Sequence, residues 1–278
     1  LSADGKKLAA EGRLSASVYA YNTDTKGNSW IGTRGGGLYF NGERYKHGDS
    51  LHWCPSNHIY DIREDTHGRI WIATWGDGLL LAKADEKRKL SFKVLQNGYF
   101  NEKYIRQIFI DNKNRMWLAT NDGLAMADVN QEEITDSSFV KFRLDNGMLP
   151  TSEIMCITII HDGTIWLGTQ SLGVLVCRYE KNGKLTYRQI STEQGLVNNN
   201  VRSILEDANG NVWVTTEEGM SRIDIEKNAI KNYRPSNEFM GNVFSEDCAT
   251  MMDDGRLLLG TTLGLATVTT NETLPDTD

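Results

Sequence analysis

A tryptophan beside an aspartate, with arginines and a tyrosine at equivalent places along the chain, is the set of side chains that best suits a ligand. An aromatic ring stacks on the C–H groups of a sugar, and an arginine fork takes a carboxylate or a sulfate. These residues follow a repeated threonine or stand one residue into an expected strand, where the repeats differ from one another. The candidate ligand-binding residues are Trp75, Asp77, Arg34, Tyr60, Arg106 and Arg202. The competing interpretation is that Trp75 fills a loop and the charges form a solvated rim.

A motif that recurs six times determines where these residues stand. Its clearest copy is Asp65, Gly68, Trp71, Thr74 and Gly78, with an apolar residue after the last glycine. The copies are centred, 41 to 49 residues apart, on Trp30, Trp71, Trp117, Trp166, Trp213 and Leu258. A period of this length in an all-β sequence is typical of a propeller with one blade per copy. The sequence therefore predicts an all-β fold, a β-propeller of four-stranded blades with six repeats visible.

Each position of the motif has a physical reason. The Asp–Gly pair marks a tight turn, because the carboxylate accepts backbone N–H groups and glycine takes a left-handed backbone. Side chains alternate along a strand, so the tryptophan and the small residue two positions later share a face. We expect the small residue to leave room for an indole between blades, and the threonine hydroxyl to find an inter-strand partner. Truncating one of the tryptophans should cost about 3–5 kcal/mol.

Four strands per repeat are predicted, the first of which lines a central channel. The first strands are expected at Val18–Thr23, Ile59–Glu64, Ile105–Ile110, Ile154–Ile159, Val201–Glu206 and Glu246–Met251. The last repeat shows no fourth strand after Leu265–Thr270, and Lys6–Glu11 should be a fourth strand without a blade of its own. We predict that this N-terminal strand completes the last blade and closes a six-bladed ring; seven blades is the alternative. Residues 1–270 would form one domain, followed by a polar tail at 271–278.

Composition narrows the function classes. The net charge is −7 and no run of Lys or Arg stands out, so nucleic acid is not an expected partner. No apolar run is long enough to span a membrane and no signal peptide is seen, so we expect no membrane contact by this fragment and a cytosolic or, better, a mature or excised chain. The four cysteines form no metal or redox motif.

Three other patterns could carry chemistry. His52, Cys54 and His58 are three potential metal ligands in one loop, but their spacing fits no zinc pattern. Carboxylates could pair across the channel mouth as a glycosidase acid and nucleophile; the candidates are Asp77, Asp122, Glu153, Glu217 and Asp247. The repeated Asp–Gly–Trp turn also looks like the Asp-box of sialidases, which is structural. We therefore predict no catalytic residue, no metal and no cofactor.

The motif Asp-x-x-Gly-x-φ-Trp-φ-Gly-Thr-x-x-Gly-Leu, preceded by Gly-Leu-x-x-Asn-x-Val, resembles the two-component regulator propeller repeat. The resemblance runs from about Gly12 to Thr270, although the fourth copy has Ile160 in place of Asp and the sixth lacks both Asp and Trp. Such repeats build the extracytoplasmic sensor regions of hybrid two-component systems, which in gut bacteria detect products of polysaccharide breakdown. Propellers of this family usually have seven blades. Full-length relatives would also carry a second propeller, a β-sandwich, a membrane span, a histidine kinase and a DNA-binding regulator.

The resemblance implies a periplasmic, non-catalytic sensor propeller that recognises an oligosaccharide, acidic ones included, or docks a neighbouring sensor domain. It also makes a homodimer of the full-length protein an expectation. One alternative is a propeller lyase or glycosidase acting on a carbohydrate, with His58 or Tyr60 as a base near the channel. The other is a purely structural propeller that binds proteins on its faces.

Overall fold

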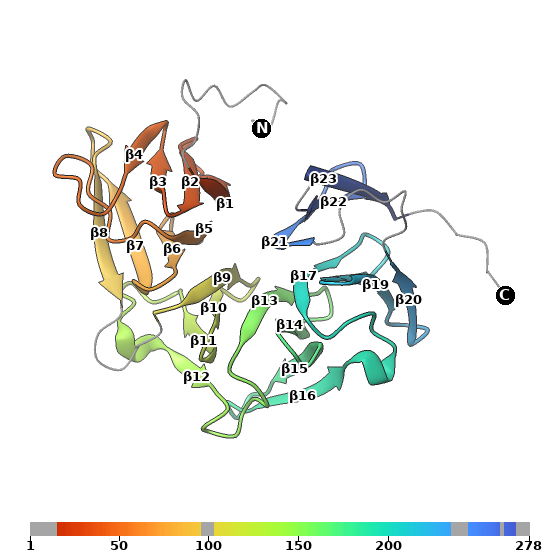
Figure 1. The fold of residues 1–278 in the computed structure, drawn as a ribbon. Helices are drawn as coiled ribbons and strands as arrows, with labels where there is room; N and C mark the ends of the chain where they lie inside the picture. Colours follow the sequence, from red (N-terminus) through yellow and green to blue (C-terminus); the bar gives the residue numbers. More distant parts are fainter. Residues whose placement is uncertain (1–15, 96–102, 235–243, 262–263, 271–278) are drawn as a thin grey trace. The chain divides into compact units, whose positions relative to one another are not determined.

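The computed structural model describes residues 16–95, 103–234, 244–261 and 264–270 (Figure 1). The predicted N-terminal closing strand, Lys6–Glu11, and the polar tail at 271–278 lie outside these residues, as does any seventh blade that would need them. The chain divides into two compact units. The first unit is Leu1–Met116 with Ala127–Phe139, and the second unit is Trp117–Met126 with Val140–Asp278.

The all-β prediction is confirmed, because the described residues form six antiparallel sheets, one for each copy of the motif, and two short 3-10 turns. The first two sheets are β1 Ser17–Thr23, β2 Ser29–Arg34, β3 Gly37–Phe40, β4 Glu43–Tyr45, and β5 Ile59–Glu64, β6 Ile70–Thr74, β7 Leu79–Ala84, β8 Leu90–Leu95. The third and fourth are β9 Ile105–Ile110, β10 Arg115–Thr120, β11 Gly123–Asp128, β12 Val140–Phe142, and β13 Ile154–Ile159, β14 Ile165–Thr169, β15 Val174–Tyr179, β16 Leu185–Ile190. The last two are β17 Val201–Glu206, β18 Asn211–Thr216, β19 Gly219–Asp224, β20 Ala229–Tyr233, and β21 Phe244–Met251, β22 Arg256–Thr261, β23 Gly264–Thr269.

Within each sheet the strands follow one another in sequence order, as the hairpin turns of the repeat predict. Four of the six expected first strands have the predicted bounds, while β1 begins one residue earlier and β21 two residues earlier. The two 3-10 turns are η1 Asp136–Ser138 and η2 Thr192–Gln194. The described part of the sixth sheet has three strands, which agrees with the missing fourth strand in the sequence.

The Asp–Gly–Trp turns are structural, as predicted. Asp24, Asp65 and Asp207 accept a hydrogen bond from the indole Nε1 of the tryptophan six residues later, at 2.9, 2.8 and 2.8 Å, and also from backbone N–H groups of their own turns. The fourth repeat lacks the aspartate and supplies another acceptor for the indole N–H. There the Trp166 indole donates to Thr164 Oγ1 at 3.1 Å. A buried N–H thus keeps an acceptor in each of these four repeats.

The threonine of the motif also behaves as expected. Its hydroxyl donates to the carbonyl of the glycine that begins the third strand, from Thr33 to Gly37 at 2.7 Å and from Thr216 to Gly219 at 2.9 Å. Because Thr33 and Thr216 are fully buried, this bond removes the penalty of an unpaired hydroxyl. It also holds the turn between the second and third strands in one conformation.

The expected reason for the small residue was wrong. A Cβ added to Gly32 would lie 2.5 Å from Ile59 Cγ2, and one added to Gly168 would lie 2.6 Å from Val201 Cγ1. Ile59 and Val201 are the first residues of the next sheet's first strand. At Gly32 and Gly168 the small residue therefore makes room for a β-branched side chain of the following repeat, and at Gly168 also for Cys156 of its own sheet, and not for an indole.

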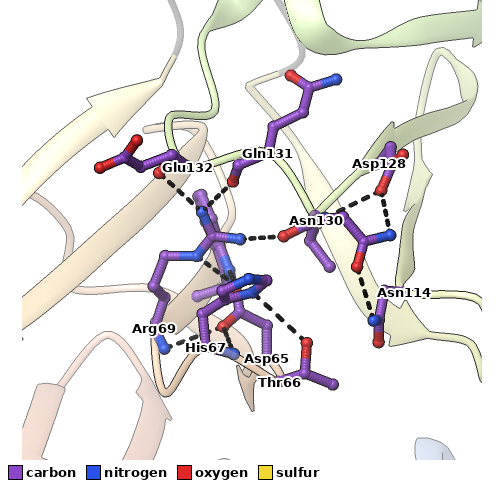
Figure 2. A network of polar contacts seen from close by, with 11 residues as sticks. Asp65, Thr66, His67, Arg69, Asn114, Asp128, Asn130, Gln131 and Glu132 are labelled. Carbon is purple, nitrogen blue, oxygen red and sulfur yellow. Dashed lines mark hydrogen bonds and ion pairs between the residues drawn. The ribbon is translucent and has the colours of Figure 1, made fainter.

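One polar network fixes the second sheet to the segment that follows β11, within the first unit (Figure 2). The Arg69 guanidinium donates to the backbone carbonyls of Val129, Gln131 and Glu132 at 2.5, 2.8 and 3.2 Å. Its Nε donates to Asp65 at 2.6 Å, so the charge is neutralised where it is largely buried. Here the arginine fills the space beside the Trp71 ring, whose centroid lies 5.6 Å from its guanidinium carbon.

Candidate functional site

The candidate residues in the first strands stand at a repeated irregularity of the backbone. The register between the first and second strands shifts at the third residue of β1, Tyr19, and at the second residue of β5, β13 and β17, which is Tyr60, Met155 and Arg202. A bulge adds one unpaired residue and re-aims its side chain. The sequence places these residues in strands, but it does not show the bulge. The structure therefore gives a physical reason why these positions can point differently from their neighbours.

Backbone hydrogen bonds join turns after second strands to loops before first strands, either of the next sheet or, as for Trp75, of the same sheet. In the first unit, Gly35 N donates to Asn57 O at 2.8 Å, Trp75 N to His58 O at 3.0 Å, and Gly76 N to Lys103 O at 2.8 Å. In the second unit, Gly173 N donates to Asn199 O at 3.0 Å. The expectation that these turns and loops share one face is met within each unit. Residues distant in sequence are thereby brought together.

In the first unit these segments assemble a continuous row of rings and cations. The Tyr19 and Tyr60 rings lie 4.9 Å apart, and Tyr60 stacks on Trp75 at 5.2 Å with 23° between the planes. The Trp75 ring also meets Tyr104 edge-on at 5.0 Å. Arg106 places its guanidinium carbon 4.5 Å from the centre of the Trp75 ring. This row is called the aromatic cluster below.

Arg34 closes the other end of the aromatic cluster. Its Nη1 donates to the Tyr19 hydroxyl at 3.2 Å, and its guanidinium carbon lies 5.9 Å from the centre of the Tyr19 ring. The cluster therefore runs from one cation to another through three aromatic rings. A guanidinium over an aromatic face is attracted to the negative face of the ring, which holds both parts in one geometry. Four predicted site residues, Arg34, Tyr60, Trp75 and Arg106, are thus brought together.

Burial decides which parts of the cluster a ligand can reach. Tyr60 is 8% exposed and supports the rings on either side of it, whereas Tyr104 is 39% exposed. Tyr19, Trp75 and Arg106 are half-buried, and Arg34 is exposed. Trp75 already contacts Tyr60, Tyr104 and Arg106, so it is a well-packed member of the cluster and not an isolated stacking platform.

Asp77, the fifth predicted residue of this unit, is half-buried two residues after Trp75, and its backbone N–H donates to Thr74 Oγ1 at 3.2 Å. Burial, with a smaller contribution from the charge of Asp77, raises the pKa of the Cys54 thiol to about 12. Asp77 is therefore held beside the loop that precedes β5. It contributes negative charge near a cluster whose ends are positive.

A buried carboxylate fixes β5 against β9 directly below the cluster. Asp61, next to Tyr60, is 5% exposed and accepts from the backbone N–H of Ile108 in β9 at 2.9 Å. It also accepts from Arg63 Nε at 3.2 Å. Because Tyr60 and Arg106 stand on these two strands, this bond fixes their relative positions. Asp61 was not singled out in the sequence, although an aspartate within a buried strand is a signal that could have found it.

Arg202, the sixth predicted residue, belongs to the second unit and has a different environment. Its guanidinium forms ion pairs with Glu217 and, at 2.8 Å, with Glu246. Met155, at the equivalent bulge, is buried. In the turn between β10 and β11, Asp122 forms an ion pair with Arg143 at 2.8 Å. The positions that form the aromatic cluster in the first unit are occupied here by ion pairs and an apolar side chain.

The other patterns of the sequence find less support in the geometry. Cys54 is fully buried, and His52 Nε2 lies 3.7 Å from Glu43. Among the described residues, no three His, Cys, Asp or Glu side chains gather as a metal site would require. Of the carboxylates considered as a catalytic pair, Asp122 and Glu217 are ion-paired to arginines, and the Asp247 side chain lies outside the described part.

Tyr19 and Tyr104 extend the site beyond the six predicted residues. Tyr19 stands at the same bulge as Tyr60, so the alignment of repeats points to it. Tyr104 forms a bridge with Trp75 through the backbone, and its only sequence signal is its place directly before β9. The sequence could therefore have selected Tyr19, whereas the contact between Tyr104 and Trp75 is visible only in the fold.

Comparisons with known proteins agree with this architecture. The model of the two-component regulator propeller matches residues 55–76, 99–122 and 195–218. Each match covers a loop, a first strand, the turn and a second strand of one sheet. A histidine kinase of Formosa agariphila is 23% identical over 165 residues, which are 58% of this chain and 12% of the kinase.

Two solved structures show the fold. The extracellular domain assigned to a hybrid two-component system of B. thetaiotaomicron superposes with a TM-score of 0.72 at 20% identity, over 91% of this chain and 35% of that chain. Virginiamycin B lyase from Staphylococcus aureus superposes with a TM-score of 0.62 at 12% identity, over 94% and 86%. The chain thus spans about a third of the sensor domain and about an eighth of the kinase that it matches.

No helix in the described residues is long and apolar enough to cross a membrane. The six sheets are the blades of a β-propeller, as their likeness to these structures shows. The resemblance of the repeat motif is confirmed by the three matched segments and by the kinase relative. This chain has a β-propeller fold, and three of its segments match the two-component regulator propeller.

Proposed function

We propose that this chain is a ligand-recognising part of a periplasmic sensor and that it catalyses no reaction itself. The matched family, the kinase relative and the extracellular domain of a hybrid two-component system support the sensor assignment. The single observation that carries ligand recognition is the aromatic cluster, a preformed row of rings with an arginine at each end. Preformed sites bind without paying the cost of ordering their side chains on association.

The ligand class follows from the chemistry of the cluster. Each guanidinium carries five N–H donors in a planar fork that suits a carboxylate or a sulfate. The edges of Tyr19 and Tyr104 offer partly exposed aromatic surface next to these cations. An oligosaccharide that carries acidic groups uses both features, with its charges at Arg34 and Arg106 and its apolar ring faces on the tyrosines. A neutral sugar would use only the second feature.

A neighbouring domain of the full-length sensor could dock on the same face instead. The exposed turns and loops that carry the cluster would then contact protein, and the full-length receptor could form a homodimer through such contacts. Competition between the oligosaccharide and the neighbouring domain would be the signature of a shared surface.

The second candidate function is that of an enzyme, and the likeness to virginiamycin B lyase is the observation in its favour. In this chain His58 and Tyr60 are the candidate bases. Tyr60 is buried and stacked within the aromatic cluster, whereas His58 is exposed and bonded through its backbone to Trp75. A base needs to reach the proton that it removes, so His58 is the better candidate of the two.

A thermal-shift screen against defined oligosaccharides, neutral and acidic, tests the proposal, with each mixture then analysed by mass spectrometry. Ligand at a hundred times its dissociation constant stabilises a fold by about 2.7 kcal/mol, which is readily seen. We expect a shift with acidic oligosaccharides that remain intact. Cleaved sugar would favour the enzyme, and no shift across the panel would favour a scaffold.

A further inference from the structure

A groove in the second unit has no role in the function proposed above. It is hollowed on one face of the fourth sheet and has a cavity of about 270 Å³. Its lining includes Thr164, Trp166, Val176, Arg178, Arg188 and, from the fifth sheet, Ile225. Trp166 pairs with Val176 and Val176 with Arg188 across three neighbouring strands, so these side chains share that face.

The cavity exists because two side chains of the fourth sheet are smaller than those at the equivalent positions of the first and second sheets. The residue paired with the motif tryptophan is Phe40 in the first sheet and Leu81 in the second, and Phe40 packs on Trp30 at 4.4 Å. In the fourth sheet this residue is Val176. Thr164 takes the place that Arg69, labelled in Figure 2, fills in the second sheet, where its guanidinium carbon lies 5.6 Å from the centre of the Trp71 ring.

The hollow continues into a second cavity of about 410 Å³, which shares Asp162 and Ile225 with the first. This part is lined by the turns that precede β14 and β18, including His161 and Glu206. The Asp162 carboxylate accepts from the backbone N–H and the hydroxyl of Thr164, at 2.8 and 2.6 Å. Burial alone would raise the pKa of Asp162, but these bonds and the charge of Arg178 lower it. Asp162 therefore remains an acceptor.

The two cavities differ in charge: the first is lined by Arg178, Arg188 and one carboxylate, that of Asp162, whereas the second is lined by several carboxylates and is acidic. Arg178 lies 3.9 Å from Asp162 in a loose contact at a largely exposed position. No carboxylate of the described residues lies within ion-pairing distance of Arg188, although Arg188 lines the cavity. Arg178 and Arg188 share one face of the sheet with Thr186, which pairs with Arg178 and stands two residues before Arg188, and the two guanidinium groups form a recess for an anion.

We propose that this groove binds a single anion-bearing sugar unit, with its carboxylate or sulfate at Arg178 and Arg188 and its ring over Val176. The sugar hydroxyls would donate to Asp162, as carboxylates accept from such groups. The first cavity, of about 270 Å³, lies near the lower end of the size range of small-molecule sites, which suits one sugar ring and not a polymer. This proposal is independent of the aromatic cluster.

Isothermal titration of the whole chain tests the site, with glucuronate and glucose 6-sulfate as the anionic probes and glucose as the neutral one. We expect both anionic sugars to bind and glucose to bind far more weakly. The variant Arg188→Gln should weaken binding about tenfold or more, because a charge-assisted hydrogen bond is lost. The variant Lys184→Gln removes one charge in the exposed turn outside the cavity and should leave the affinity unchanged.

A second variant tests the cavity and not the charge. Val176→Phe places in the fourth sheet the residue that the first sheet tolerates opposite its tryptophan, and it should abolish binding while the far-ultraviolet circular dichroism stays that of the wild type. Binding that survives Arg188→Gln, or that is lost in Arg106→Gln instead, would assign the sugar to another surface and overturn the proposal. Absence of binding by the wild-type chain would overturn it as well.

Discussion

The bulges that open the first strands carry very different side chains in the two units. In the first unit, Tyr19 and Tyr60 stack in a row that ends in Arg34 and Arg106. In the second unit, Met155 is buried and Arg202 is held by two glutamates. The backbone device is the same in both. The repeat thus decides where a side chain points, and the residue type decides whether that position can receive a ligand.

The arginines at these positions also have different surroundings in the two units. In the first unit, Arg34 donates to the Tyr19 hydroxyl and Arg106 lies over the face of the Trp75 ring, so both arginines are part of an aromatic surface. Arg202, in contrast, sits between two carboxylates, so the local sum is negative. We therefore place the acidic oligosaccharide at the first-unit cluster and not at Arg202. The following predictions test this division, starting with what the two units share.

The largest effect should be equal in both units, because the tryptophan scaffold is common to them. Trp71→Ala and Trp213→Ala should each lower the free energy of unfolding by about 3–5 kcal/mol, since each removes a buried indole. Urea denaturation measures this. Trp53→Ala is the control, because Trp53 is 47% exposed, and its effect should be clearly smaller. A similar loss in all three variants would mean that burial in the motif has no special weight.

Removing the hydrogen-bond acceptor of the tryptophan indole should have the next largest effect on the free energy of unfolding. The effect should be larger in the fifth repeat, where the acceptor is an aspartate, than in the fourth, where it is a threonine. Asp207→Ala removes the acceptor of the Trp213 indole and of two backbone N–H groups, and should cost about 1.5–3 kcal/mol. Thr164→Val removes the acceptor of the Trp166 indole and the hydroxyl that donates to the partly exposed Asp162, and should cost about 1–2 kcal/mol. Urea denaturation of both variants gives the comparison. Equal losses would show that the fourth repeat relies on Thr164 as much as the fifth relies on Asp207.

Removing the ion pairs of the second unit should have a modest effect. Arg202→Gln leaves Glu217 and Glu246 without their shared cation, but both carboxylates are partly exposed to solvent. We expect a loss of about 0.5–1 kcal/mol, which shrinks at high salt because solvent and ions screen such charges. Thermal denaturation at low and high salt measures it. If salt does not change the loss of stability, the loss comes from the packing of the apolar part of the Arg202 side chain and not from its charge.

The smallest effect distinguishes the two units by pH. Glu64 accepts from Thr25 in the first unit, and Glu206 accepts from His161 at the equivalent turn of the second. The hydrogen bond and the charge of Glu206 raise the pKa of His161 above its ordinary value of 6.5. The protonated form is therefore favoured in the folded state, and its stabilisation is present below pH 6.5 and lost as the pH rises through the folded-state pKa.

The wild-type chain should accordingly lose more stability between weakly acidic and weakly alkaline pH than the variant His161→Thr, which copies the first unit. Melting temperatures recorded across this range give the difference. If the melting temperatures of the variant and the wild type change in parallel with pH, the His161–Glu206 contact makes no pH-dependent contribution to stability.

The repeat made most of the fold predictable, because its turns and strands depend on local chemistry. Asp–Gly turns and alternating side chains placed the first strands to within two residues. The reason given for the small residue failed, since Gly32 adjoins Ile59 of the next sheet and only the packing between sheets reveals this. The sequence also did not show that Thr164 replaces the aspartate as the acceptor of the indole N–H. The aspartate stands six residues before the tryptophan and Thr164 only two, so the two residues do not align.

The candidate site was predictable in part. Aligned repeats pointed to the turn and bulge positions, and four of the six predicted residues meet in one cluster. The partners of each residue were not predictable, because they depend on which strands adjoin. Arg106 and Arg202 occupy equivalent positions in the sequence, yet one lies over a tryptophan ring and the other between glutamates.

The measurement that tests the central claim most directly is calorimetric titration of an acidic oligosaccharide into three forms of the chain: wild type, Arg106→Gln and Arg202→Gln. If the first-unit cluster is the binding site, Arg106→Gln weakens binding by about 1.5–3 kcal/mol and Arg202→Gln leaves it unchanged. The two variants remove the same charge from equivalent positions, so each controls for the other. Loss of affinity in Arg202→Gln with no loss in Arg106→Gln would contradict the claim.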